Sequence, residues 1–344
     1  MTGLKRSSLI HLLFWFLKDG RFTLQPDRNR CLVLGGCGFL GSNLVERLFT
    51  EGYHVRILDR SSAGCRNLAS VKGKFEFFQG DFLNPADIEK ALEDIDFVFH
   101  LVGTTLPISS NQNPVFDIES NVVGTVQLLQ ACIRRRLKKV VFSSSGGTVY
   151  GQPNRLPIQE DDPTNPICSY GVTKLTVEKY LQLLYHIHGL DYTILRIANC
   201  YGKNQKVTGA QGAIGVFLSR IMQGKPITIW GDGSTTRDYI HVEDVADAFV
   251  KALTQSSKYR IFNIGTGVGT SLRDLLDKME RITGIKPQVE YETSRLVDVP
   301  LNILDSRRAQ EHMGWRFKID CETGLRKTWT WLTGKEAQVV GSTQ

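Results

Sequence analysis

The sequence predicts a doubly wound α/β fold, in which helices cover both faces of a parallel sheet. From about residue 30 to residue 197, short apolar stretches alternate with longer amphipathic ones, a rhythm typical of repeated βαβ units. The short stretches are rich in β-branched and other apolar residues along their whole length, as strands buried on both faces are. We expect strands at 31–34, 55–58, 97–101, 140–144 and 193–197, and helical stretches at 40–50, 88–92, 125–134 and 172–186.

Past residue 197 the alternation weakens, because glycine and proline interrupt it. Helical stretches at 213–223 and 301–313 surround short strands such as 227–230 and 261–264. We interpret this region as a smaller α/β lobe on the substrate side of the sheet.

Composition and charge exclude several classes of protein. The 344 residues are 41% hydrophobic and 22% charged, which excludes a disordered chain, and no apolar run is long enough to span a bilayer. The net charge of +7 favours a polyanionic ligand without selecting one. We interpret the basic run at 134–139 as a solvated helix end rather than a nucleic-acid surface.

The cysteines and the N-terminal segment bear on the compartment. Seven cysteines are scattered without a Cys-x-x-Cys pair, so we expect neither a disulfide framework nor a zinc site, and a reducing cytoplasm fits best. In residues 1–29 a basic pair precedes the apolar stretch 9–17, but no small-x-small cleavage site follows. We expect a short helix that packs on the body or on a partner, and the alternative is an interfacial membrane helix.

A glycine-rich turn follows the first predicted strand. Gly35, Gly38 and Gly41 lie at the boundary between this strand and the next helix, where the absence of side chains lets backbone N–H groups reach a pyrophosphate. The second predicted strand ends in Asp59, where a carboxylate can bind the hydroxyls of an adenosine ribose. A carboxylate there repels a 2′-phosphate, so the sequence favours NAD over NADP, although the neighbouring Arg60 weakens this preference.

Tyr170 and Lys174 are the candidate catalytic pair. They are four residues apart and therefore on one face of a helix, where an ammonium is expected to lower the pKa of the phenol and make it a usable base. A strand that ends in three serines precedes them and can hold a substrate oxygen beside the tyrosine. We favour Ser145, the last serine of the run, as the catalytic hydroxyl, with Ser144 as the alternative.

Together these segments resemble the extended short-chain dehydrogenases/reductases, and most of all the nucleotide-sugar epimerases of the UDP-glucose/UDP-galactose 4-epimerase type. The resemblance runs from about residue 30 to residue 333. It implies a Rossmann domain that binds NAD and a lobe that binds a nucleotide sugar. We expect the chain to divide into an N-terminal extension (1–29), the Rossmann domain (30–196 and 236–262), the lobe (197–235 and 263–333) and a tail (334–344).

The resemblance also implies roles for individual residues. Those expected to bind the cofactor are Gly35, Gly38, Phe39, Leu40, Gly41, Asp59, Asp81, Phe82, Leu101 and Lys174. Those expected to bind the substrate are Asn199, Arg237, Arg295, Asp298 and Asn302. Asn302 matches a gate beside the C2 substituent of the sugar, and a side chain smaller than tyrosine leaves room there for an acetamido group. The serine run is not followed by the Asp-Glu pair that sugar 4,6-dehydratases use.

The function implied is epimerisation of a UDP-sugar, at C4 of a UDP-N-acetylhexosamine or a UDP-hexose, by transient oxidation and hydride return with NAD as the cofactor. A nucleotide-sugar ketoreductase or a C2 epimerase is the first alternative. The second is a non-catalytic nucleotide- or RNA-binding protein on the same fold. We expect a homodimer formed through the helices near 115–134 and 170–188, no nucleic-acid partner and no metal.

Overall fold

A seven-stranded parallel sheet forms the centre of the larger part of the molecule. The computed structural model describes residues 29–207, 212–293 and 299–334. The strand order is β10-β6-β5-β4-β1-β2-β3, and the order reverses between β1 and β4, which places a ligand crevice beyond their carboxyl ends. The strands are β1 (Arg30–Leu34), β2 (His54–Asp59), β3 (Glu76–Gln79), β4 (Phe97–His100), β5 (Lys139–Ser145), β6 (Tyr192–Ile197) and β10 (Ile261–Ile264).

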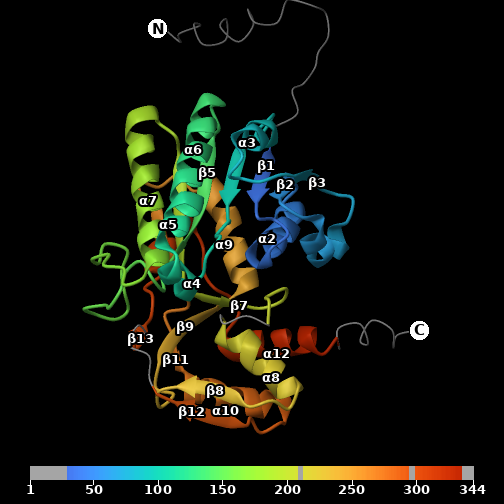
Figure 1. Ribbon diagram of the computed structural model, residues 1–344, viewed down its shortest axis with the longest axis vertical. Coiled ribbons are helices and arrows are strands. Elements are labelled where there is room, and N and C mark those ends of the chain that lie inside the picture. Colours follow the sequence, from blue (N-terminus) through green and yellow to red (C-terminus); the bar gives the residue numbers. More distant parts are fainter. Residues whose placement is uncertain (1–28, 208–211, 294–298, 335–344) are drawn as a thin grey trace, which may run out of the picture.

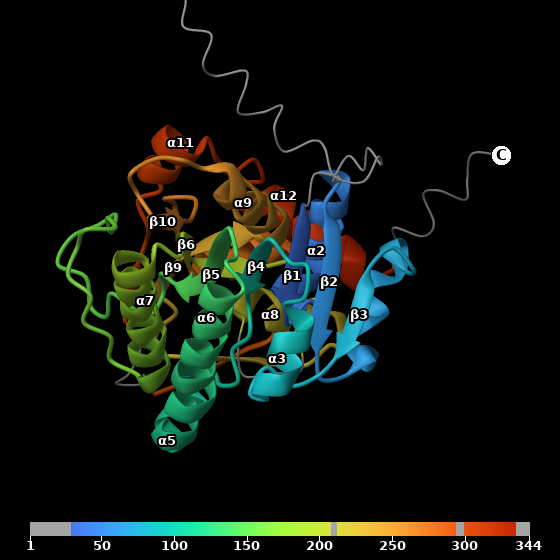
Figure 2. The same ribbon diagram turned by 90° about the horizontal axis from the view of Figure 1, so that it is seen from above.

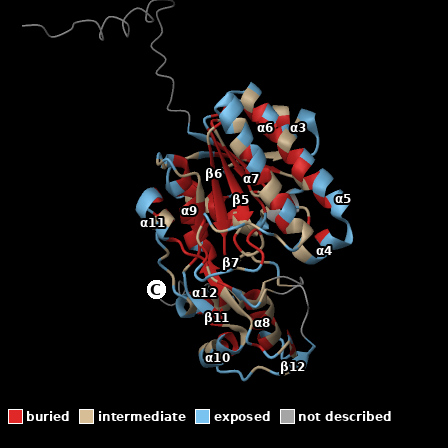
Figure 3. Ribbon diagram, turned by 90° about the vertical axis from the view of Figure 1, so that its left-hand side faces the viewer, coloured by how far each residue is buried: buried red, intermediate tan, exposed pale blue. Residues whose placement is uncertain are grey.

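Helices cover both faces of this sheet, as Figure 2 shows from above. One face packs against α2 (Phe39–Thr50), α9 (Val242–Thr254) and α11 (Arg307–Met313). The other face packs against α3 (Pro85–Ala91), α6 (Gly124–Arg134) and α7 (Ser169–His188). Side chains of β5 and β6 are buried between these layers, whereas the outer helices expose one side to solvent (Figure 3).

Several short elements connect the strands. A 3-10 segment, η1 (Ser62–Val71), follows β2. Between β4 and α6 the chain forms α4 (Pro107–Gln112), α5 (Pro114–Asp117) and the π-helical η2 (Ile118–Val123), so that α5, η2 and α6 make one nearly continuous helical rod.

The smaller lobe lies below the sheet in Figure 1 and has a core of its own. It is built from α8 (Ala213–Met222), β8 (Ile227–Trp230), α10 (Leu272–Thr283), β12 (Val289–Glu292) and α12 (Cys321–Leu332). A second sheet joins the two parts, with β9 (Thr236–His241) paired to β7 (Asn199–Tyr201), β11 (Gly269–Ser271) and β13 (Leu301–Asn302).

The predicted fold class is confirmed, with two local corrections. The helix expected over 301–313 is wrong in its first part: Leu301–Asn302 pairs with β9 as β13, and the helix begins at Arg307. At the observed start of the helix, the Asp305 carboxylate accepts the Arg307 N–H at 3.0 Å and so stabilises the turn into the helix. The strand at 261–264 does form, but as the outer strand β10 of the large sheet beside β6.

Our predictions for the N-terminal extension and the tail concern residues 1–28 and 335–344, which are outside the described residues. Among the helices in the described ranges, none has the length and apolar character needed to cross a bilayer.

Candidate active site

The glycine turn between β1 and α2 is too close-packed for side chains. Gly35 has φ of +77°, and a Cβ on Gly41 would lie 2.2 Å from the Gly35 carbonyl oxygen. The N-cap of α2 is Gly38, which offers no side chain to the first N–H groups, and the first helical turn carries no acidic residue. These N–H groups and the positive end of the helix dipole therefore form a site that favours an anion.

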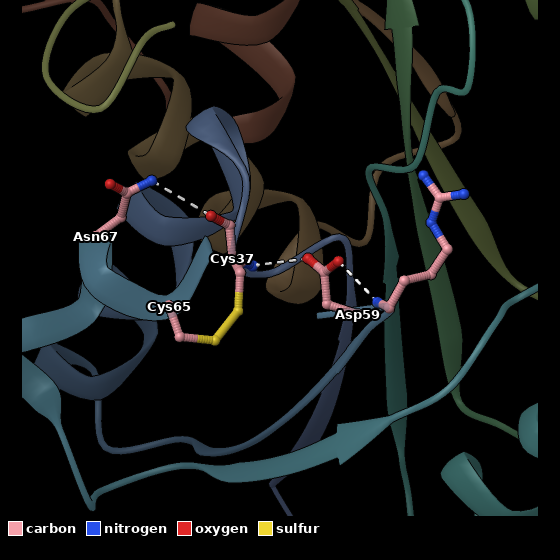
Figure 4. The surroundings of a disulfide bond; sticks show 5 residues. Cys37, Asp59, Cys65 and Asn67 are labelled. Atoms are coloured by element: carbon pink, nitrogen blue, oxygen red, sulfur yellow. Dashed lines mark hydrogen bonds between the residues drawn. A yellow bond between two sulfur atoms is a disulfide. The ribbon is translucent and has the colours of Figure 1, made fainter. Parts of the chain in front are cut away.

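Asp59 lies where the turn meets the second strand. Its Oδ2 accepts the backbone N–H of Cys37 at 3.2 Å, and its Oδ1 accepts the N–H of Arg60 at 2.9 Å (Figure 4). The carboxylate is thus fixed beside the turn, and its remaining acceptor capacity is suited to vicinal ribose hydroxyls. The donors of the turn and this acceptor together fit the pyrophosphate and the adenosine ribose of NAD.

The same turn carries a disulfide, which corrects our expectation of unpaired cysteines. Cys37 in the turn is bonded to Cys65 in η1, with their Cα atoms 4.7 Å apart (Figure 4). The Asn67 amide also donates to the Cys37 carbonyl at 3.3 Å. The pairing depends on η1 folding back over the turn, so the spacing of the cysteines along the chain carried no signal of it. The other five cysteines are free.

Three further residues expected at the cofactor lie at the ends of β3 and β4. The Asp81 carboxylate accepts the Leu83 N–H at 3.0 Å and so closes a local turn. Phe82 is buried in the core with its ring centroid 5.7 Å from that of His100. Leu101 follows β4 and is half-buried. Asp81 and Leu101 therefore lie at the rim of the crevice, whereas Phe82 supports it from within the core.

Tyr170 and Lys174 lie in the first two turns of α7, whose side chains reach the carboxyl end of β5. The Lys174 ammonium donates to the Ser143 carbonyl at 2.9 Å and lies 5.6 Å from the centroid of the Tyr170 ring. Within the described chain, the Tyr170 hydroxyl has no hydrogen-bond partner. The phenol is thus available to a ligand.

The predicted lowering of the Tyr170 pKa is wrong for the chain without ligands. Burial raises the pKa of Tyr170 to about 12, with smaller contributions in the same direction from Cys168 and Asp117. Burial also lowers the pKa of Lys174 to about 8. Loss of hydration outweighs the attraction between the two groups, because the ammonium is held on the Ser143 carbonyl instead of on the phenol.

The three serines at the end of β5 have different environments. Ser144 is buried and donates to Glu178 on α7 at 2.5 Å. Glu178 is also bound by the Arg196 guanidinium of β6, with Nη2 and Oε2 2.7 Å apart. Ser145 is half-buried, and no described residue forms a hydrogen bond with its hydroxyl. Ser144 is therefore part of a buried network, and Ser145 is the partly exposed serine whose hydroxyl has no partner in the described chain.

The residues expected at the substrate share the sheet around β9. Arg237 pairs in register with Asn302 of β13, and its Nη1 donates to the carbonyl oxygens of Thr236 and Pro300. Asn199 of β7 donates to the Asp238 carbonyl at 3.3 Å. Arg295 and Asp298 lie outside the described residues.

Asn302 connects this sheet to the catalytic strand. It is buried, and its amide donates to the carbonyl of Gly146, the residue after Ser145, at 3.1 Å. Its Oδ1 is buried without a partner in the described part of the chain. An unpaired buried acceptor is costly unless a ligand donates to it, so this atom is a candidate contact for a substrate N–H or O–H group.

Sequence reasoning missed the residues that hold the start of α7. Ser110 and Asn111 of α4 accept the N–H groups of Tyr170 and Ser169 at 2.9 and 2.8 Å. Asp117 binds side chains on either side of Tyr170. These contacts span more than 50 residues of sequence, and no local pattern indicates them.

Comparison with known proteins identifies the family of the chain. The family model described as the NAD-dependent epimerase/dehydratase family matches residues 31–265. The UDP-glucose 4-epimerase of Mycolicibacterium smegmatis is 39% identical over 304 residues, which cover 87% of this chain and 97% of that protein.

Two solved structures with similar folds carry informative ligands. The UDP-glucose 4-epimerase of Thermus thermophilus, in complex with NAD, has a TM-score of 0.83 and 33% identity, covering 89% of this chain and 99% of that chain. The UDP-N-acetylglucosamine 4-epimerase of Methanobrevibacter ruminantium, in complex with UDP-N-acetylmuramic acid, has a TM-score of 0.83 and 30% identity. The match covers 89% of this chain and 98% of that chain. The chain therefore belongs to the NAD-dependent epimerase/dehydratase family, as an NAD-dependent epimerase of the extended short-chain dehydrogenase/reductase type.

Proposed function

We propose that this enzyme inverts C4 of the hexose in a UDP-sugar. The observation that supports the proposal is that two hydroxyls without a hydrogen-bond partner in the described chain, those of Tyr170 on α7 and Ser145 at the end of β5, belong to two elements that the Lys174–Ser143 hydrogen bond joins. The relatives named above act on UDP-sugars at this carbon by name. A binding module would have no use for this arrangement of groups.

The chain's own residues would handle the proton and orient the sugar. The glycine turn and Asp59 would hold NAD, which would supply a reversible hydride acceptor for the sugar carbon. Tyr170 as phenolate would take the proton from the C4 hydroxyl and give it back, while Ser145 would hold the same oxygen by a hydrogen bond. Lys174, one turn further along α7, would stabilise the phenolate. Atoms and electrons balance, because the proton and the hydride both return to the sugar.

The diphosphate would be held away from the reacting carbon. Arg237 presents a planar donor fork at the edge of β9, and Asn199 lies on the adjacent strand β7. Arg295 and Asp298 remain predicted contacts of the nucleotide. Binding energy from this remote part of the substrate would keep the ligand in place while the oxidised sugar turns over in the crevice.

We infer that the sugar is a UDP-N-acetylhexosamine. The inference rests on Asn302, which is smaller than the tyrosine that some members of the family carry at this position and has a buried acceptor without a partner in the described chain. An acetamido N–H could satisfy this acceptor. A UDP-hexose remains the alternative substrate, tested below.

We also propose a homodimer. Apolar residues are exposed along one side of α7, at Val172, Leu183 and Ile187. Val115 and Ile118 add exposed apolar surface at the start of the adjacent rod formed by α5, η2 and α6. Two copies related by a two-fold axis could bury both surfaces against each other in an antiparallel four-helix arrangement.

Replacing Tyr170 with Phe should reduce kcat at least about 100-fold, because the group that transfers the proton is removed. NAD binding should be unchanged, since the phenol is not one of the groups that hold the dinucleotide. NMR of products from UDP-sugars measures turnover, and protein fluorescence measures NAD binding. Tyr180→Phe, on an exposed part of the same helix, is the matched control. Normal turnover by Tyr170→Phe would refute the assignment.

Ser145→Ala and Ser144→Ala should have opposite effects. We expect Ser145→Ala to lower kcat about 100-fold with little change in stability, because a hydrogen bond to the reacting oxygen is lost. Ser144→Ala should keep kcat within a few-fold but destabilise the fold by about 1–3 kcal/mol, because buried Glu178 loses a donor. Steady-state kinetics and urea unfolding of both variants check this. The reverse pattern would show that Ser144 is the catalytic hydroxyl.

The wild-type enzyme should epimerise UDP-N-acetylglucosamine with a kcat/KM at least equal to that for UDP-glucose, because the site has room at C2. NMR of the product identifies the inverted carbon, and absorbance at 340 nm follows the cofactor. Conversion of UDP-glucose alone would contradict the role of Asn302. Stoichiometric consumption of NADH would indicate a ketoreductase, and inversion at C2 would indicate a C2 epimerase.

In solution the protein should have twice the 38.6 kDa mass of the chain. Leu183→Asp should convert it to a monomer, because a charge in an apolar interface loses its hydration. Ile285→Asp, at an exposed apolar position of the smaller lobe, is the control and should stay dimeric. Sedimentation velocity measures both. A monomeric wild-type protein would contradict the proposed interface.

A further inference from the structure

Asp117 is a buried carboxylate at the junction of α5, α7 and the loop after β4. It is fully buried, and its Oδ1 accepts the Thr105 hydroxyl and the Asn121 amide, the latter at 2.9 Å. Its Oδ2 accepts the Ser169 hydroxyl at 2.7 Å and the Thr173 hydroxyl at 3.3 Å. Both oxygens of this side chain therefore form hydrogen bonds with neighbouring side chains.

The two hydroxyls on Oδ2 flank the proposed catalytic groups. Ser169 directly precedes Tyr170, and Thr173 directly precedes Lys174. The Ser169 bond is the shorter of the two, and the Thr173 hydroxyl is also 3.0 Å from the Tyr170 carbonyl, so it shares its proton between the carboxylate and the helix backbone. Together these bonds restrain the rotation of the first turn of α7, and with it the direction in which Tyr170 and Lys174 leave the helix.

The sequence of α7 does not itself cap this turn. The N-cap residue, Cys168, makes no side-chain hydrogen bond to the helix. Instead, Ser110 and Asn111 of α4 accept the N–H groups of Tyr170 and Ser169. The carboxylate of Asp117 adds a negative charge at the positive end of the helix dipole. The start of α7 is therefore positioned from outside the helix, by α4 and α5.

Asp117 also acts on the charges of the pair. Across the described ranges it forms no ion pair, and its charge raises the pKa of both Tyr170 and Lys174. Other titratable groups near the pair are Cys168, Glu178, which is bound to Arg196, and His100 on β4, which is neutral because burial lowers its pKa to about 3. Asp117 is thus the unpaired negative charge next to Tyr170.

We propose that Asp117 is the positioning residue of the Tyr170–Lys174 pair, which it holds in place through the hydroxyls of Ser169 and Thr173. The role rests on the proposed function of Tyr170 as the proton acceptor. It deepens that function by naming a residue that touches neither substrate nor cofactor and still sets the geometry and the charge of the catalytic pair.

Asp117→Asn keeps the size of the side chain and removes its charge. We expect kcat to fall about tenfold or more with KM little changed, because the bound substrate meets a misdirected phenol. The pH at which kcat is half-maximal should move, because Asp117 raises the pKa of both Tyr170 and Lys174 and the variant removes its charge from both groups. A purely structural role would lower stability without moving this midpoint.

The double variant Ser169→Ala/Thr173→Val separates position from charge. It keeps the carboxylate but cuts its link to α7, so kcat should fall with the pH midpoint unchanged. Hydrogen exchange followed by mass spectrometry should show faster exchange of the amides at 169–174 in this variant and in Asp117→Asn. The double variant also keeps the proposal testable where Asp117→Asn fails to fold.

Asp96→Asn is the control. Asp96 is a buried carboxylate at the amino end of the central strand β4, where it accepts the Arg30 N–H at 3.1 Å and forms an ion pair with Lys138 at 3.0 Å. This variant should unfold more easily but keep the kcat, the pH midpoint and the exchange of α7 of the wild-type protein.

The outcomes separate this inference from the proposed function. Unchanged exchange of the α7 amides in both Asp117→Asn and the double variant would overturn the positioning role, whatever the substrate is. An Asp117→Asn pH profile that superimposes on the wild-type profile, or an equal shift in Asp96→Asn, would overturn it as well. Failure of the wild-type protein to convert any UDP-sugar would instead refute the proposed function, and the exchange measurement would still decide the positioning.

Discussion

The buried carboxylate of Glu178 is the interaction on which the geometry of the site depends. It lies one helical turn beyond Lys174 and binds both Arg196 of β6 and Ser144 of β5. Arg196 extends the network to the Tyr150 hydroxyl at 2.9 Å. Removing one partner from a buried ion pair lowers the stability of a protein by about 3–5 kcal/mol. A shift of α7 along the sheet would separate Glu178 from Arg196, and the ion pair therefore opposes it. Glu178 fixes the middle of the helix and Asp117 fixes its start, with the catalytic pair between them.

The same desolvation that makes the network strong sets the electrostatics of the site. Burial raises the pKa of Tyr170 to about 12 and lowers the pKa of Lys174 to about 8, because each group is more stable uncharged when water is removed. The phenol of Tyr170 is therefore protonated at neutral pH. A proton acceptor would form there only when the surroundings of the phenol change, which makes the positions of Lys174 and Asp117 relative to it decisive.

The smaller lobe is tied to the Rossmann part on both sides of the crevice. On the cofactor side, Asn204, in the loop after β7, donates to the Ser42 hydroxyl of α2 at 3.1 Å. On the catalytic side, Asn302 donates to Gly146 at 3.1 Å. The sheet that joins the two parts is thus held, through these contacts, against the elements that carry the glycine turn and the proposed catalytic serine.

Local patterns were enough to predict the fold class, the glycine turn with Asp59, and the Tyr170–Lys174 spacing, because periodicity, turn geometry and helical spacing are local properties of the chain. Four features became visible only in the folded chain: the bond between Ser144 and Glu178, the pairing of Cys37 with Cys65, the extension of a sheet by residues 301–302, and the contact of Asp117 with α7. The tertiary structure also reversed the expected direction of the Tyr170 pKa. These contacts and the Tyr170 pKa depend on burial and on segments that are distant in the sequence. The local spacing of residues contains no signal of either.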